Sequence, residues 1–327
     1  MIPVCQPSTT KHEIKWVNKA LKENKIGNSD FIELFEKEFN KHIGTKDCVA
    51  VSSGTTALHL ALVAANVKKG DTVLIPDWTM IAVPNAVSYC GATPIFSENE
   101  ITKRTKAIIV CHLFGWRTPM EYWKKLAKKY KLILIEDAAE YTGKKLEGDM
   151  ICFSFFANKI ITTGEGGAIC ANKYGNELRK LRNHYFGKKR FIHKKIGYNY
   201  RMTSLQAAYG LGQLERWDEL FKKRIQIRDY YAKRLNGIVN VVDGDVCWMV
   251  LIAAPKRDKL MKYLNRKGIE TRTGFYPINK QPMYLSGGHH EETEWLWKNT
   301  MYLPTYYDLT RKQQDYIIGH IKKFYEN

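Results

Sequence analysis

The sequence predicts an α/β fold with a mostly parallel central sheet flanked by helices and a smaller C-terminal α+β domain. Three observations predict it. The 327 residues are 44% hydrophobic and 26% charged, which is globular composition with room for about two domains of ~150 residues. Short apolar, β-branched runs alternate with helical patterns. Most runs are apolar at consecutive positions, as expected for strands that are buried on both faces.

Six runs are the expected strands of the central sheet. They span residues 48–52, 72–75, 107–111, 132–135, 151–155 and 168–171. Helices are expected between them at residues 55–66, 80–90 and 119–129. Strands that alternate with helices are typical of β–α–β units, whose strands run parallel.

Helical patterns flank these runs on both sides. One helix is expected from Thr10 to before Gly27, and a second begins at Asp30, with Glu33 completing a capping-box-like start. After Thr203 a long helical pattern continues to about residue 235. Further on we expect a strand at 246–253, a helix at 256–266, a strand near 269–271 and a last helix from residue 310.

The chain is expected to divide into a large domain, residues 1–215, and a small C-terminal domain, residues 216–327. The long pattern after Thr203 supplies the connecting helix. No Gly/Ser-rich or Pro-rich linker separates the two parts, so they are expected to share an interface with a cleft.

The charge balance raises a different class of function. Lys and Arg number 52 against 33 Asp and Glu, a formal net charge of +19, and a strongly basic protein can bind nucleic acid. The lysines are spread over most helices, however, and neither zinc-finger spacing nor an aromatic RNA-binding segment is present. A nucleic-acid-binding or regulatory protein is therefore kept as the alternative, and neither a nucleic-acid nor a membrane partner is expected.

The location is predicted from what the sequence lacks. No apolar run approaches the ~20 residues that span a bilayer, and the first residues lack the basic and apolar regions of a secretory signal. The seven cysteines are scattered singly, without a C-x-x-C pair. We expect reduced thiols, no metal site and a cytoplasmic protein.

Small hydroxyl-bearing residues follow the first expected strand. In the run from Ser52 to Ala57, Gly54 and Thr55 open a helix. Unpaired backbone N–H groups and the positive end of a helix dipole suit a phosphate group. An ordinary helix N-cap explains this turn equally well.

Two further strands end in residues that carry chemistry. Asp137 closes the apolar run at 132–135 and can hold a protonated ring nitrogen, although a helix-capping role is the simpler interpretation of an isolated Asp. Lys159 follows the strand at 151–155 and precedes a glycine-rich turn at 164–167. Burial depresses a lysine pKa, and the neutral amine can form a Schiff base.

Six motifs in order resemble one family. They are SSGTTALHLAL (52–62), IEDAAE (135–140), SFFANKIITTGEGG (154–167), IGYNYRMTSLQAA (196–208), IETRTGFYPINKQP (269–282) and YLPTYYDLT (302–310). The chain resembles the DegT-type, pyridoxal-phosphate-dependent sugar-nucleotide aminotransferases. It is most similar to the GDP-perosamine synthase branch, which makes 4-amino-4,6-dideoxy sugars. The resemblance implies the fold-type I aminotransferase architecture.

The resemblance also implies roles for particular residues. Lys159 would bond to the cofactor aldehyde and move the proton during transfer, and Asp137 would pair with the pyridine nitrogen. Gly54, Thr55 and Ser154 would bind the cofactor phosphate. Glu140 would lie beside the cofactor. The asparagine matching Asn199 reaches that phosphate from the neighbouring subunit, so a homodimer with shared active sites is implied.

Two of the departures from the family pattern concern site residues. Met80 stands where many relatives carry an aromatic residue over the cofactor ring, and Trp78 is the other candidate for stacking. Asn279 stands where relatives often have a histidine near the sugar.

The implied reaction transfers an amino group in two halves. Glutamate gives its amino group to pyridoxal 5'-phosphate, and the resulting pyridoxamine 5'-phosphate passes it to C4 of a nucleotide-linked 4-keto-6-deoxyhexose. A basic stretch could line the entrance for the substrate diphosphate, although a solvated loop is an equally good interpretation. Its residues are Lys188, Lys189, Arg190, Lys194 and Lys195.

Overall fold

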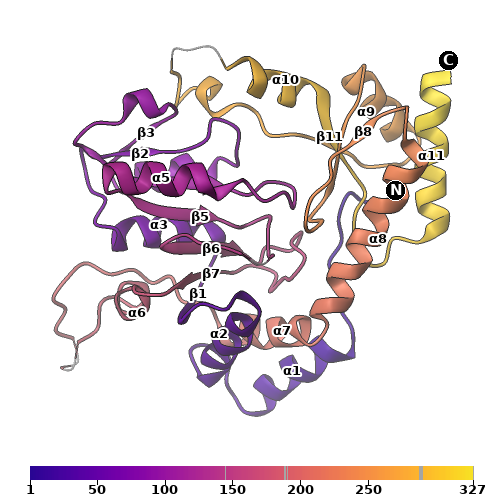
Figure 1. The fold of residues 1–327 in the computed structure, drawn as a ribbon. Helices are drawn as coiled ribbons and strands as arrows, with labels where there is room; N and C mark the ends of the chain where they lie inside the picture. Colours follow the sequence, from indigo (N-terminus) through magenta and orange to yellow (C-terminus); the bar gives the residue numbers. More distant parts are fainter. Residues whose placement is uncertain (144, 188, 190, 287–289, 327) are drawn as a thin grey trace.

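The computed structural model describes residues 1–143, 145–187, 189, 191–286 and 290–326 (Figure 1). Two sheets and the helices packed on them make up these residues. The α-helices are α1 (Lys11–Lys22), α2 (Asp30–Ile43), α3 (Gly54–Ala64), α4 (Ala82–Tyr89), α5 (Met120–Tyr130), α6 (Gly175–Arg182), α7 (Ser204–Leu214), α8 (Trp217–Leu235), α9 (Arg257–Arg266), α10 (Glu291–Asn299) and α11 (Arg311–Glu326). The strands are β1 (Asp47–Val51), β2 (Thr72–Leu74), β3 (Thr93–Ile95), β4 (Thr105–Cys111), β5 (Ile133–Asp137), β6 (Met150–Ser154), β7 (Gly167–Ala171), β8 (Asn240–Val241), β9 (Val250–Ala253), β10 (Arg272–Thr273) and β11 (Thr300–Leu303).

The central sheet has seven strands in the order β1-β7-β6-β5-β4-β2-β3. The strands from β6 to β3 are parallel, and β7 runs antiparallel to both β6 and β1. All six expected strands are present, so the mostly parallel sheet is confirmed. The short strand β3 was not predicted, because its sequence Thr-Pro-Ile lacks an apolar run.

Both faces of this sheet are buried, as the consecutive apolar positions predict. On one face, Ile109, Ile135 and Cys152 pack in a cluster with residues of α3 and α4. On the other face, Ile108 and Leu134 pack under α5. The helices α1, α2 and α7 gather at the β1 edge of the sheet (Figure 1).

Two expectations about helices differ from the structure. The N-cap of α2 is Ser29, whose hydroxyl accepts from the Phe31 N–H, rather than Asp30. The long pattern after Thr203 is broken into α7 and α8 at residues 215–216. The buried Arg216 guanidinium there pairs with Glu13 at 3.2 Å, which ties the break to α1.

The second sheet is antiparallel, in the order β10-β11-β9-β8. The strand expected near 269–271 lies slightly later, at β10. Buried residues of α8, α9 and α11 form a separate apolar core with β9 and β11. We keep the division into residues 1–215 and 216–327 as a proposal, which the break between α7 and α8 and this separate core support.

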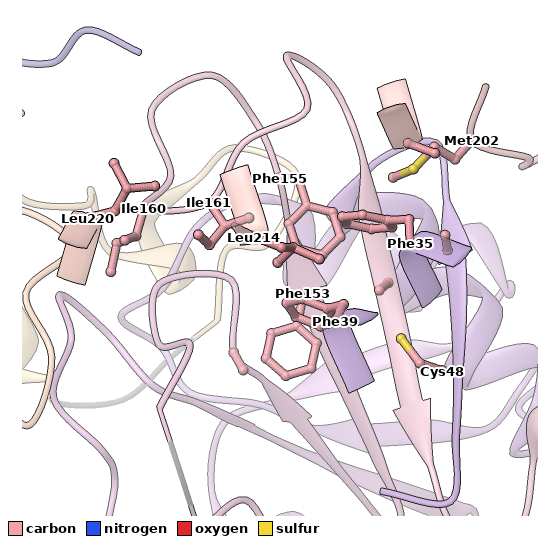
Figure 2. Packing of buried hydrophobic residues seen from close by; sticks show 14 of the residues in the cluster. Phe35, Phe39, Cys48, Phe153, Phe155, Ile160, Ile161, Met202, Leu214 and Leu220 are labelled. Atoms are coloured by element: carbon pink, nitrogen blue, oxygen red, sulfur yellow. The ribbon is translucent and has the colours of Figure 1, made fainter. Parts of the chain in front are cut away.

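The segment that carries Lys159 is anchored in a phenylalanine-rich core. The Phe155 ring lies 5.2 Å from Phe35 and 4.9 Å from Phe39, both on α2. After the lysine, Ile160 and Ile161 are buried in the same cluster (Figure 2). Because buried residues hold the chain on both sides of it, the lysine backbone has little freedom to move.

Two features are absent from the described residues. No described helix combines the length and the apolar character that a bilayer crossing demands. No group of three or more His, Cys, Asp or Glu side chains in the described part of the chain is placed to hold a metal ion. The seven cysteines are free thiols.

Candidate active site

A cavity of about 820 Å³ opens where the carboxyl ends of the parallel strands face the second sheet. Ligands of open α/β sheets bind at this end of the strands. Seven of the predicted site residues line the cavity: Gly54, Thr55, Met80, Asp137, Glu140, Ser154 and Lys159. The structure thus brings together residues that lie up to 105 positions apart in the sequence.

The turn between β1 and α3 forms one wall of the cavity. Ser53 caps α3, and its hydroxyl accepts from the Thr56 N–H at 3.1 Å. A side chain at Gly54 would place its Cβ 2.8 Å from the Ser154 Cβ, and a side chain at Gly167 would overlap the Ser53 carbonyl. Glycine is therefore required at both positions for the helix N-terminus and Ser154 to lie side by side.

Asp137 lies buried at the end of β5. Its Oδ1 accepts from the Ala139 N–H at 3.0 Å, and the Cys111 Sγ lies 3.9 Å from Oδ2. Burial raises the pKa of Asp137, while the Ala139 N–H and the Lys159 charge act in the opposite direction. A buried carboxylate with few donors is stabilised by a cation brought next to it.

Lys159 points into the same cavity. Its Nζ lies 4.2 Å from the centre of the Trp248 ring and 3.8 Å from Glu140 Oε1. Burial lowers the pKa of Lys159, while the Glu140 and Asp137 charges raise it. Lowering the pKa increases the fraction of neutral amine, the form that attacks an aldehyde.

Glu140 is the third titratable group at the inner end of the cavity. Burial raises its pKa to about 7, although the Lys159 charge and the Phe114 N–H oppose the shift. That N–H donates to Oε2 at 3.0 Å. Glu140 therefore takes up or releases a proton close to neutral pH, within reach of the lysine.

Four other predicted site residues do not line the cavity in a single chain. Trp78 donates its ring N–H to the Phe275 carbonyl at 2.9 Å and packs against Phe114. Asn279 is buried outside the lining. Asn199 and Lys194 are exposed. Lys188 and Arg190 lie outside the described residues.

The sequence analysis missed several residues of the cavity wall. Trp248 lies under the lysine amine, Tyr302 packs 5.8 Å from Trp248, and Arg272 lines the solvent side. Trp248 and Tyr302 sit in apolar runs that look like ordinary core. Only the pairing of β9 with β11, and of β11 with β10, places them at the cavity.

The donor set of this cavity fits pyridoxal phosphate. The α3 N-terminus with Ser154 suits its phosphate, the Asp137 carboxylate suits its ring nitrogen, and the Lys159 amine suits its aldehyde. Met80 and Ala139 also line this cavity. Three different chemical groups of one small molecule therefore have a matching partner.

Comparison with known proteins decides the family. The model of the DegT/DnrJ/EryC1/StrS aminotransferase family matches residues 7–322. The chain belongs to this aminotransferase family. It is 40% identical to the GDP-perosamine synthase of Escherichia coli O157:H7, over 100% of this chain and 99% of that one. It is 37% identical to the GDP-perosamine synthase of Caulobacter vibrioides, over 97% and 96% of the two chains.

Solved structures agree with the fold. The chain matches S. venezuelae DesV with a TM-score of 0.89 and 27% identity, over 96% of this chain and 94% of that one. The aminotransferase TlmJ from Streptoalloteichus hindustanus matches with a TM-score of 0.94 at 23% identity, over 100% and 99% of the two chains. The expected family, the aminotransferase fold and the enzyme class are therefore confirmed.

Proposed function

We propose that this aminotransferase carries out pyridoxal-phosphate-dependent transfer of an amino group from glutamate to C4 of a nucleotide-linked 4-keto-6-deoxyhexose. The product is a 4-amino-4,6-dideoxy sugar nucleotide of the perosamine or viosamine type. The similarity to two proteins named GDP-perosamine synthase supports the substrate class. The observation that carries the proposal is that Lys159, Asp137 and the α3 N-terminus face one cavity.

The bound cofactor would supply an aldehyde for the lysine and a ring that accepts electrons from the substrate carbon. The protein supplies position and protons. The α3 N-terminus and Ser154 bind the phosphate, and Asp137 holds the ring nitrogen in its charged form. The Lys159 Nζ would carry a proton to and from the substrate carbon.

Glu140 keeps that proton available. With a pKa raised to about 7 and an oxygen 3.8 Å from the Lys159 Nζ, it is near the midpoint of its titration at neutral pH. A group in this condition can accept and return a proton with little free-energy change. The Phe114 N–H holds its carboxyl in place.

The complete site is proposed to need a second copy of the chain. Asn199 is exposed. The carbonyl of the next residue, Tyr200, accepts from the Ser52 N–H at 2.9 Å, at the start of the turn between β1 and α3. The preceding segment exposes apolar side chains, with Phe191 72%, Ile192 57% and Ile196 83% exposed. Exposed apolar clusters of this kind mark protein interfaces, which supports a homodimer.

The free thiols support a cytoplasmic location.

The test is a substrate screen. Purified enzyme loaded with pyridoxal phosphate is incubated with glutamate and then with the GDP-, UDP- or dTDP-linked 4-keto-6-deoxyhexose. We expect glutamate to remove the yellow colour, and one of the nucleotide sugars to restore it while a 4-amino sugar forms. Retention of colour with glutamate, or no amino sugar with any of the three, would contradict the proposal.

A further inference from the structure

The cavity wall carries a cation to which no role has yet been assigned. Among the described residues that line the cavity, the lysine and arginine side chains are Lys159 and Arg272. Lys159 lies at the inner end, beside Glu140 and Trp248. Arg272 lies on β10 with 55% of its side chain exposed, so it stands at the solvent side of the cavity.

Arg272 is held in one orientation by Glu270. The Arg272 Nε and Nη2 donate to Glu270 Oε1 at 3.3 and 3.1 Å. Glu270 is itself fixed, because its Oε2 accepts from the Val4 N–H at 3.0 Å. Among the described residues, the Arg272 Nη1 has no hydrogen-bond partner. The guanidinium is thus placed in advance, with one N–H edge left for a ligand.

A basic groove continues outward from this point. It is lined by Met261, Lys262, Asn265, Arg266 and Thr271, and has a volume of about 520 Å³. Met261 also lines the cavity, so the two spaces meet at this residue. The lining of this α9 groove contains two cations and no carboxylate.

The shape of the substrate decides what fits here. In a nucleotide-linked 4-keto sugar, the diphosphate is attached across the ring from the reacting carbon. When that carbon reaches Lys159, the diphosphate therefore points away from the inner end of the cavity. The cavity must also hold the cofactor, which leaves the nucleoside to lie outside it.

We propose that Arg272 binds the substrate diphosphate and that the nucleoside lies along the α9 groove, near Lys262 and Arg266. This inference rests on the proposed function. It replaces the basic stretch at 188–195 as the diphosphate site within one chain. In the described part of that stretch, Lys195 donates to Glu177 at 2.8 Å, and neither Lys189, Lys194 nor Lys195 lines the cavity.

Calorimetric titration with nucleoside diphosphates tests the proposal without turnover. The enzyme in its pyridoxamine phosphate form is titrated with GDP, UDP and dTDP. The affinities of the variants are then measured with the nucleotide that the wild type binds most tightly. We expect Arg272→Gln to weaken binding by about 10-fold or more, the usual effect of losing a charge-assisted hydrogen bond. The affinity of Arg272→Lys should lie between those of the wild type and Arg272→Gln, because lysine keeps the charge but lacks the planar guanidinium.

The groove itself is tested by two matched lysine variants on α9. Lys262→Gln should weaken binding by about threefold, as for an exposed charge pair. Lys259→Gln makes the same charge change on the same helix, at a residue that does not line the groove, and should have no effect. Since both side chains are exposed, neither substitution threatens folding.

The outcomes separate this inference from the proposed function. In Arg272→Gln, the half-reaction with the nucleotide sugar should slow by a larger factor than the half-reaction with glutamate, which is measured by the loss of colour. Wild-type nucleotide affinity in Arg272→Gln would overturn the inference, and so would a loss confined to the glutamate half-reaction. A wild-type enzyme that neither loses colour with glutamate nor binds any nucleotide would instead contradict the proposed function.

Discussion

The inner end of the cavity and its mouth are built from different kinds of structure. At the inner end, Asp137 is the last residue of the buried strand β5, and Lys159 follows the buried strand β6 by five residues in the same mostly parallel sheet. At the mouth, Arg272 lies on a two-residue edge strand of the other sheet. The proposed lysine chemistry is thus placed on the rigid sheet, whereas the residue proposed to meet the variable part of the substrate lies on a short peripheral strand.

The largest effect is expected from removing the lysine amine. Lys159→Ala should lower turnover on the order of 10⁴-fold and abolish the visible band of the lysine-bound cofactor, because no other described amine lines the cavity. Absorbance spectra and steady-state rates measure both. Lys173→Ala, at an exposed lysine, is the control. If the variant kept both the visible band and turnover, Lys159 would not be the reacting amine.

The second effect concerns the carboxylate at the end of β5. Asp137→Asn should keep the fold and lower kcat by about 10²- to 10³-fold, since a neutral amide no longer favours the charged ring nitrogen. Circular dichroism checks that the fold is kept, and steady-state kinetics measure kcat. Asp308→Asn, at an exposed position, is the control. A near-normal rate would remove Asp137 from the mechanism.

The third effect is a pH dependence of stability at the inner end. Burial raises the Glu140 pKa from 4.5 to about 7, so between these pH values the folded protein binds the proton more tightly than the unfolded chain. The free energy of unfolding contributed by Glu140 is complete below pH 4.5 and is lost as pH rises towards 7.

This change can be measured against Glu140→Gln, which lacks the titration. From pH 4.5 to 7, the cofactor-free wild type should lose about 3 kcal/mol of stability relative to Glu140→Gln in urea denaturation. A constant difference between the two proteins over this range would mean that the Glu140 pKa is not raised.

The smallest effect is expected at Asn279, outside the cavity lining. Asn279→Ala should change kcat/KM for the nucleotide sugar by less than about threefold, because Asn279 is buried away from the cavity lining. Comparison of kcat/KM for the three nucleotide sugars checks this. A loss of 10-fold or more for one sugar would extend the substrate site to this residue.

The inner end of the cavity can be predicted from the sequence better than its mouth. The strands of the central sheet are predictable because each is a local apolar run. The positions of Asp137 and Lys159 follow from them, since Asp137 ends β5 and Lys159 lies five residues after β6. The reversal of β7 is not predictable from such runs, since a buried antiparallel strand has the same pattern as a parallel one. Arg272 and Tyr302 reach the cavity only through pairing of distant strands.

The central claim is that the Lys159 amine bonds to pyridoxal phosphate. Reduction of the yellow holoenzyme with borohydride, followed by proteolysis and mass spectrometry, makes that bond permanent and locates it. The account predicts one phosphopyridoxyl adduct, on the peptide that contains Lys159. An adduct on a different lysine, or none on a protein that had been yellow, would contradict it.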